Sequence, residues 1–162
     1  MKFPVFPRFS PFTTAWSRLL QQNEASTLDR LSRPADRQSL EQFREFVLKR
    51  AGRLPQDVVL KIELVIEELL LNVFNYAYGP EEHGSVEVEC GFVKGRGFML
   101  RVKDRGKAFN PLVQPQPNLD AEIEQRRRGG LGILLVKEMS KSQDYRRVND
   151  SNVLEIVFET PA

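Results

Sequence analysis

The middle of the chain carries the longest helical pattern of apolar and polar positions. No glycine or proline interrupts residues 56–78, which lie between Pro55 and Gly79-Pro80. Apolar residues recur there at intervals of three and four, at Ile62, Ile66, Leu69 and Val73. This period predicts an amphipathic helix that begins near Pro55 and ends near Tyr78.

Two further helices are predicted on either side of this one. Residues 35–51 place apolar side chains at helical spacing, and Gly52 ends the pattern. A glycine-rich run at 129–132 opens the other helix, whose apolar positions are Ile133, Leu134, Val136 and Met139.

Strict alternation of apolar and polar residues predicts the strands. Residues 86–92 and 98–103 alternate and are separated by Gly95-Arg96-Gly97, which predicts an antiparallel hairpin. The other predicted strands cover about 26–33, 144–148 and 153–159, with a turn at 149–152 between the last two.

The order of these elements predicts the fold class. Strands that follow each other directly pair as antiparallel hairpins, and the helices are expected on one face of the sheet. We therefore expect an α+β fold, a two-layer sandwich, over residues 27–162. Residues 1–26, in which prolines punctuate phenylalanines, are expected to form a separate arm that packs on its own domain, on a dimer mate or on a partner.

Composition narrows the classes of function. A net charge of +2 does not indicate nucleic-acid binding. The single cysteine, Cys90, excludes a disulfide within the chain, and the single histidine, His83, removes the usual Ser-His-Asp chemistry unless it serves itself. No apolar run approaches the ~20 residues of a membrane span. We expect a cytoplasmic protein without a direct nucleic-acid or membrane partner.

Three polar residues interrupt the apolar character of the central helix. At about 100° per residue, Glu68, Asn72 and Asn75 fall on one narrow stripe between apolar flanks. Burial of an unpaired carboxylate costs several kcal/mol, so the stripe calls for an explanation. Glu68 can act as a general base, and the Asn72 carbonyl can bind Mg²⁺. The alternative is a buried polar pair that caps a neighbouring loop.

A second motif follows the predicted hairpin. Asp104 comes at the end of a strand and Gly106 two residues later. The carboxylate can accept a hydrogen bond from an exocyclic amine, and the glycine can let a planar base approach the backbone. An ordinary Asp-Gly turn would look the same.

A third motif is the run Arg126-Arg127-Arg128-Gly129-Gly130-Leu131-Gly132. Backbone N–H groups of such a run at a helix N-terminus form an anion-binding nest. It is not a P-loop, because no Gly-Lys-Ser/Thr follows, and a solvated basic loop or a hinge is the alternative. Together, the three motifs supply a base, a metal ligand, an amine acceptor and a phosphate cradle, which indicates a purine nucleoside triphosphate site.

These motifs resemble, in the same order, the ATP-binding superfamily of gyrase, heat-shock chaperone, histidine kinase and mismatch-repair ATPases. The resemblance covers roughly residues 27–160 and implies the Bergerat-type ATP-binding fold. The motifs are most similar to those of the anti-sigma-factor serine kinases of bacterial partner-switching systems. In this chain the three motifs are Glu68-Leu-Leu-Leu-Asn72, Asp104-Arg-Gly106-Lys-Ala-Phe109-Asn-Pro111 and Arg128-Gly-Gly-Leu-Gly-Ile-Leu-Leu-Val136.

The resemblance implies roles for individual residues. Glu68 would be the general base for a substrate serine, Asn72 would hold Mg²⁺, and Asp104 would read the adenine amine of ATP. Gly106 would let the adenine sit close, and residues 112–128 would form the ATP lid. The motifs also place in the nucleotide site Asn75, Ala108, Phe109, Arg128, Gly129, Gly130, Leu131 and Gly132, with Gly130 and Gly132 at the phosphates.

The chain departs from the family pattern at two positions. Family members often have histidine where this chain has Tyr76, and some have a second glycine where it has Ala108. ATP binding is still expected with these two residues, whereas the departures argue against turnover of the bound ATP.

The resemblance implies an ATP-dependent serine kinase that phosphorylates an anti-sigma-antagonist protein and binds a sigma factor; a homodimer is common in families of this appearance. One alternative is a nucleotide-sensing module that switches partners without transferring phosphate. Another is a detached histidine kinase catalytic domain, whose substrate would be in trans because His83 lies in a predicted loop rather than a helix.

Overall fold

The computed structural model describes residues 28–113 and 131–160. The predicted arm at 1–26, and residues 114–128 of the predicted lid, lie outside this part of the chain. The described strands form one antiparallel sheet in the order β1-β2-β3-β5-β4. They span Asp29–Pro34 (β1), Ser85–Val93 (β2), Gly97–Asp104 (β3), Ser142–Val148 (β4) and Ser151–Phe158 (β5).

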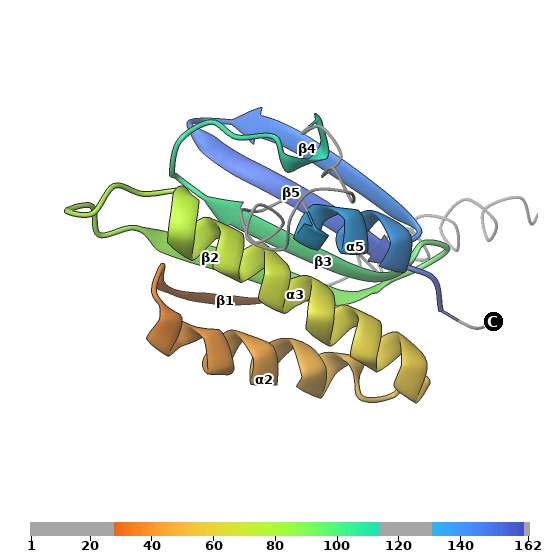
Figure 1. Cartoon of the computed structure of the whole chain (residues 1–162). Coiled ribbons are helices and arrows are strands. Elements are labelled where there is room, and N and C mark those ends of the chain that lie inside the picture. The colour runs from red at the N-terminus through yellow and green to blue at the C-terminus, as the bar shows by residue number, and fades with distance from the viewer. Residues whose placement is uncertain (1–27, 114–130, 161–162) are drawn as a thin grey trace, which may run out of the picture.

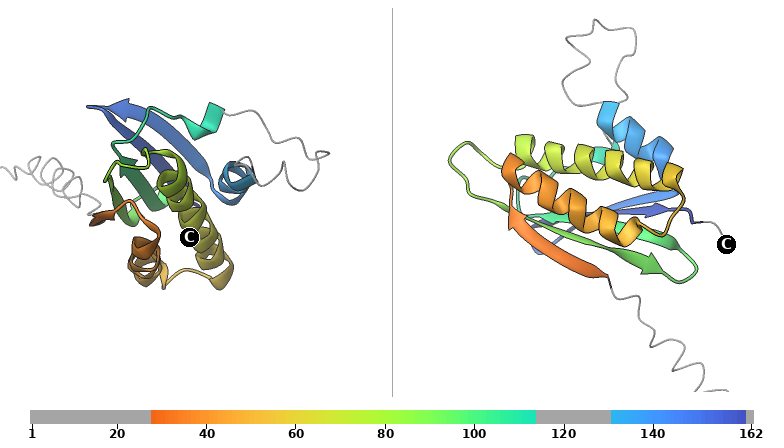
Figure 2. Two further views of the ribbon diagram at one scale, coloured as in Figure 1. Left: turned by 60° about the vertical axis from the view of Figure 1, so that its left-hand side comes forward. Right: turned by 90° about the horizontal axis from the view of Figure 1, so that it is seen from below.

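The helices lie on one face of this sheet (Figures 1 and 2). α2 (Leu40–Ala51) and α3 (Gln56–Tyr76) run side by side, and α5 (Leu131–Met139) packs against α3. The predicted two-layer α+β sandwich is confirmed. None of the helices in the described ranges is long and apolar enough to cross a membrane.

The core lies between the two layers, as the apolar periods predict. α3 buries Ile62, Ile66 and Leu69, and β2 points Val86 and Val88 toward them. The alternation fails at Phe92, which shares the side of these valines but is 46% exposed near the end of β2. Its ring instead makes an edge contact with Phe98.

Two predicted boundaries were wrong. The helix expected from residue 35 starts as a 3-10 turn, Arg37–Ser39, because the Asp36 side chain accepts a hydrogen bond from the Ser39 N–H at 2.9 Å. The expected turn at 149–152 contains only two turn residues, Asn149 and Asp150, with φ of 46° and 59°. Positive φ at both positions suits a tight hairpin, so residues 151 and 152 belong to β5.

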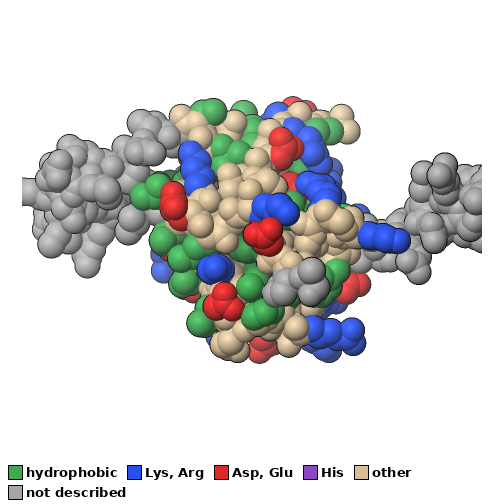
Figure 3. All heavy atoms as spheres, turned by 90° about the vertical axis from the view of Figure 1, so that its right-hand side faces the viewer, with side chains coloured by type: hydrophobic (Ala, Val, Ile, Leu, Met, Phe, Trp, Pro, Cys, Tyr) green, Lys and Arg blue, Asp and Glu red, His purple; other side chains and the backbone are tan. Residues whose placement is uncertain are grey.

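The outer face of the sheet carries charged side chains. Glu155 is 6% exposed and accepts hydrogen bonds from Arg96 and Arg101. Burial alone would raise the pKa of Glu155, but these two arginines lower it below its ordinary value. Figure 3 shows another side of the molecule, where basic, acidic and hydrophobic side chains are interspersed.

Candidate functional site

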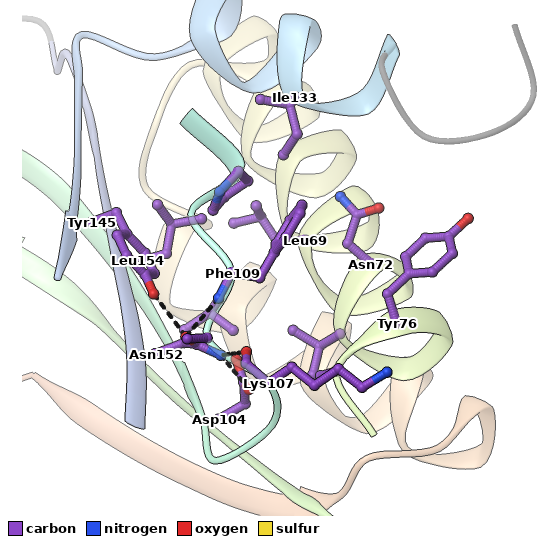
Figure 4. Close-up of a pocket in the computed structure, with 15 residues that line it drawn as sticks. Leu69, Asn72, Tyr76, Asp104, Lys107, Phe109, Ile133, Tyr145, Asn152 and Leu154 are labelled. Atoms are coloured by element: carbon purple, nitrogen blue, oxygen red, sulfur yellow. Dashed lines mark hydrogen bonds between the residues drawn. The ribbon is translucent and has the colours of Figure 1, made fainter. Parts of the chain in front are cut away.

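A cavity of about 180 Å³ opens between α3, the end of β3 and β5 (Figure 4). One water molecule needs only ~10–15 Å³ by this measure, so the protein's own side chains leave substantial space. α3 contributes Leu69, Asn72, Val73 and Tyr76; the segment after β3 contributes Lys107, Ala108, Phe109 and Pro111; other elements contribute Ala77, Val102, Asp104, Ile133, Tyr145, Asn152 and Leu154.

Two of the predicted motifs meet at this cavity. Asn72 lines it from α3, and Asp104 lines it from the last position of β3. Ala108 and Phe109 line it from the loop that follows β3. Residues that are 32 positions apart in the sequence therefore line the same cavity, as expected if they serve one ligand.

Glu68 lies one helical turn before Asn72, at the edge of this site. It does not line the cavity itself; it is half-buried and packs against the backbone of Gly132 in α5. A Cβ at Gly132 would collide with the Glu68 carboxylate, so glycine permits this contact. Burial, and secondarily the negative charge of Glu67, raise the pKa of Glu68. A raised pKa makes the ionised carboxylate a stronger base.

Gly106 has a different neighbour from the one expected. It does not line the cavity, and a Cβ there would collide with the carbonyl oxygen of Ala77 at the end of α3. The Gly106 N–H donates to Asp104 Oδ1 at 2.8 Å, and the next N–H, of Lys107, donates to the Ala77 carbonyl at 2.9 Å. The glycine thus lets the loop dock on α3 and orients Asp104.

The remaining predicted residues divide into three groups. Asn75 is exposed and does not line the cavity; its Oδ1 accepts a hydrogen bond of 3.5 Å from Arg37. Gly132 lies in the first turn of α5, beside Glu68. Outside the described residues lie Arg128, Gly129 and Gly130, together with the side chain of Leu131.

The two departures from the family pattern also lie at the cavity. Tyr76 lines it from the last position of α3 and is 54% exposed, and Ala108 lines it from the loop. The two positions at which this chain differs from the family pattern are therefore part of the cavity lining.

Among the polar lining residues, the sequence analysis missed Lys107, Tyr145 and Asn152. Asn152 was assigned to a turn because it ends a run of polar residues. Two-residue alternation extended backward from Leu154 and Ile156 would have placed it on the same side of β5 as these core residues. It is 6% exposed and pairs across the sheet with Asp104.

Tyr78 fixes the end of α3 to the sheet close to this site. Its ring stacks on Gly84, where any Cβ would collide with it. Its hydroxyl donates to the Ser85 carbonyl at 2.8 Å and accepts from the Arg105 N–H at 3.0 Å. Burial raises the pKa of Tyr78, so it remains a neutral donor. α3 and the β3 loop are thereby held in register on opposite sides of the cavity.

Comparison with solved structures finds several similar chains, among them two histidine kinase chains. The histidine kinase domain from the Erythrobacter litoralis EL346 blue-light activated histidine kinase aligns with a TM-score of 0.48 and 18% identity, over 64% of this chain and 45% of that one. The blue-light activated histidine kinase from the same organism aligns with a TM-score of 0.49 and 19% identity, over 65% of this chain and 31% of that one. This chain thus spans less than half the length of either.

A search of curated proteins finds no significant match. Residues 33–158 match the family model described as a histidine kinase-like ATPase domain. The match spans α2, α3, α5 and the strands β2 to β5, and hence every described wall of the cavity. Membership of this family implies ATP binding. The chain belongs to the histidine kinase-like ATPase domain family.

Proposed function

We propose that this protein is an ATP-dependent serine kinase. It phosphorylates an anti-sigma-antagonist protein and binds a sigma factor in a cytoplasmic partner-switching pathway. The ATPase-domain family match supports the nucleotide, and the resemblance of the three motifs to the anti-sigma-factor serine kinases supports the substrate class.

The carrying observation is the placement of Glu68 and Asn72 on one face of α3. Asn72 lines the cavity, and Glu68 lies one turn away with a raised pKa. A module that only binds nucleotide has no need for a half-buried carboxylate at this position, whereas a kinase needs a group that receives the proton of the attacking hydroxyl.

Adenine recognition is assigned to the opposite wall. Asp104 is 7% exposed and accepts its two described hydrogen bonds, from Gly106 and Asn152, at Oδ1. The carboxylate is thus held in one orientation, and its second oxygen is left to accept from the adenine amine. Apolar neighbours such as Leu69 and Leu154 offer packing for the faces of a purine ring.

The chemistry at Asn72 fits a magnesium ion that is held mainly by phosphate. Among the described residues, His, Cys, Asp and Glu side chains form no cluster of three or more that could hold a metal. Mg²⁺ at nucleotide sites typically keeps several waters and takes one or two protein ligands plus phosphate oxygens. Asn72 Oδ1 would be such a ligand, and the ion would neutralise charge on the phosphates.

In the proposed transfer, the substrate serine Oγ attacks the γ-phosphorus of ATP. The Oγ–P bond forms as the bond between the γ-phosphorus and the β–γ bridging oxygen breaks, and ADP leaves with that oxygen. The serine proton passes to Glu68. The protein's contribution is position and charge, because phosphoryl transfer requires little covalent chemistry from the enzyme.

A nucleotide-sensing module without transfer is the second candidate. Tyr76 and Ala108 favour it, since both differ from the family pattern and both line the cavity. In that case the partner switch would follow ATP or ADP occupancy alone.

Incubation with γ-labelled ATP, Mg²⁺ and a candidate antagonist protein separates the two. The kinase proposal predicts label on a serine of the antagonist. Label-free antagonist, together with tight and nucleotide-dependent binding of the same protein, would establish the sensing module instead.

A further inference from the structure

Asn152 makes more side-chain hydrogen bonds than the proposed ligand-binding residues around it. Its Nδ2 donates to Asp104 Oδ1 at 2.9 Å and to the Lys107 carbonyl at 2.8 Å. Its Oδ1 accepts from the Phe109 N–H at 3.3 Å and from the Tyr145 hydroxyl at 2.8 Å. Arg147 Nη1 also donates to Oδ1, at 2.9 Å. Figure 4 shows the bonds from Asn152 to the lining residues Asp104, Lys107, Phe109 and Tyr145.

The pattern permits only one orientation of the Asn152 amide. Its nitrogen faces two acceptors, Asp104 Oδ1 and a backbone carbonyl, while its oxygen faces a backbone N–H and the arginine, which can only donate. A flipped amide would place donors against donors and acceptors against acceptors. Both Nδ2 hydrogens are therefore committed within the protein, and none remains for a ligand.

We propose that Asn152 is a positioning residue that sets the preference of this site for adenine. It acts through Asp104: with the Gly106 N–H, the Asn152 amide holds Oδ1, so that the second carboxylate oxygen faces the exocyclic amine as an acceptor. The inference rests on the proposed ATP-binding function and adds a residue that determines base selectivity without touching the base.

The register of the sheet supports this role. Asp104 and Asn152 are direct cross-strand partners at the ends of β3 and β5, and both are at least nine-tenths buried. In the same side chain, the bonds to Lys107 and Phe109 anchor the loop that lines the cavity. One amide thus fixes both the base-reading carboxylate and the loop next to it.

The test compares two ligands that differ by one amino group. Isothermal titration calorimetry on the full chain with Mg²⁺ measures binding of ADP and of purine riboside 5′-diphosphate, which lacks the adenine amine. A hydrogen bond to a charged acceptor predicts that the wild-type protein prefers ADP by about tenfold to a hundredfold.

Two substitutions at Asn152 should reduce this preference. Asn152→Leu removes the donor to Asp104, and Asn152→Asp replaces it with a carboxylate oxygen that repels Oδ1. Both are expected to lower the preference for ADP by about tenfold or abolish it. A residue that served packing alone would weaken both nucleotides by the same factor and leave their ratio unchanged.

Arg147→Ala is the matched control. It removes one donor to Asn152 Oδ1 and the hydrogen bond of 2.9 Å from Arg147 Nη1 to the Gly106 carbonyl, but it leaves both Nδ2 bonds. The ratio should therefore persist. Thermal unfolding shows whether each variant is folded; if Asn152→Leu is not, the near-isosteric Asn152→Asp decides.

An unchanged ratio in folded Asn152 variants overturns the positioning role. An equal loss of preference in Arg147→Ala also overturns it, since the effect would then belong to the loop in general. If the wild-type chain bound neither diphosphate, the proposed ATP-binding function itself would be wrong. That outcome differs from the two above, in which the wild-type chain binds ADP.

Discussion

The two ends of the cavity are built differently. At the β3–β5 end, Asp104 and Asn152 are 7% and 6% exposed and are hydrogen-bonded to each other. At the α3–α5 end, Glu68 and Asn72 are only half-buried. No hydrogen bond joins Asn72 to another residue drawn in Figure 4, and the Glu68 carboxylate packs against a glycine backbone.

In the proposed function, this difference separates nucleotide recognition from phosphate transfer. The β3–β5 end satisfies its polar groups before a ligand arrives, which reduces the ordering cost of binding. The α3–α5 end keeps a carboxylate partly desolvated, and the raised pKa of Glu68 is the result. Substitutions at the first end should therefore change which nucleotide binds, and substitutions at the second should change what happens to it.

The largest expected effect is at Glu68. Glu68→Gln removes the proton acceptor while keeping size and shape, so phosphate transfer to the antagonist should fall about a hundredfold to ten-thousandfold. Mg-ATP binding should remain, because the base-reading end is intact. Single-turnover transfer and calorimetric titration measure the two properties. Transfer at the wild-type rate would remove Glu68 from the mechanism.

The second-largest effect is expected at Asp104, at the β3–β5 end, and it concerns nucleotide affinity. Asp104→Asn exchanges an acceptor-only group for one that also donates, so ATP binding should weaken about tenfold to a hundredfold. The preference for ATP over GTP should shrink with it. Competition binding of both triphosphates checks this. If the parent protein already bound ATP and GTP equally, Asp104 would not read the amine.

A smaller effect is expected where the recognition end docks on α3. Gly106→Ala places a methyl group against the Ala77 carbonyl, so the free energy of unfolding should drop by about 1–3 kcal/mol. Urea unfolding measures it. Gly95→Ala is the control: its position is open, and only its φ of 73° opposes a side chain, so it should cost less.

The two ends of the cavity leave different signals in the sequence. Glu68 and Asn72 lie in one long helix, where a local period suffices to place them on one face. Local alternation could place Asn152 on the core side of β5, but its pairing with Asp104 depends on the register between β3 and β5, which joins positions 48 residues apart. The contact of Gly106 with Ala77 is likewise tertiary. The Asp104-Arg-Gly106 motif did identify Gly106, but glycine is required there because the loop packs against the end of α3.

The smallest effect concerns stability rather than activity. Because the pKa of Glu68 is raised in the folded state, the folded protein binds more protons than the unfolded chain between the ordinary and the raised pKa. Stability from this group is therefore lost as the pH rises through that window.

Glu68→Gln has no carboxylate to desolvate on folding. At pH 7 its free energy of unfolding should therefore exceed that of the wild type, by about 0.5 kcal/mol or less for a half-exposed group. The difference should vanish once the pH is well below the ordinary glutamate pKa, where both side chains are neutral; urea unfolding at about pH 3 and pH 7 measures it. A variant that was less stable at pH 7 would show that Glu68 makes a stabilising contact, and the division between a hydrogen-bonded β3–β5 end and a partly desolvated α3–α5 end would no longer hold.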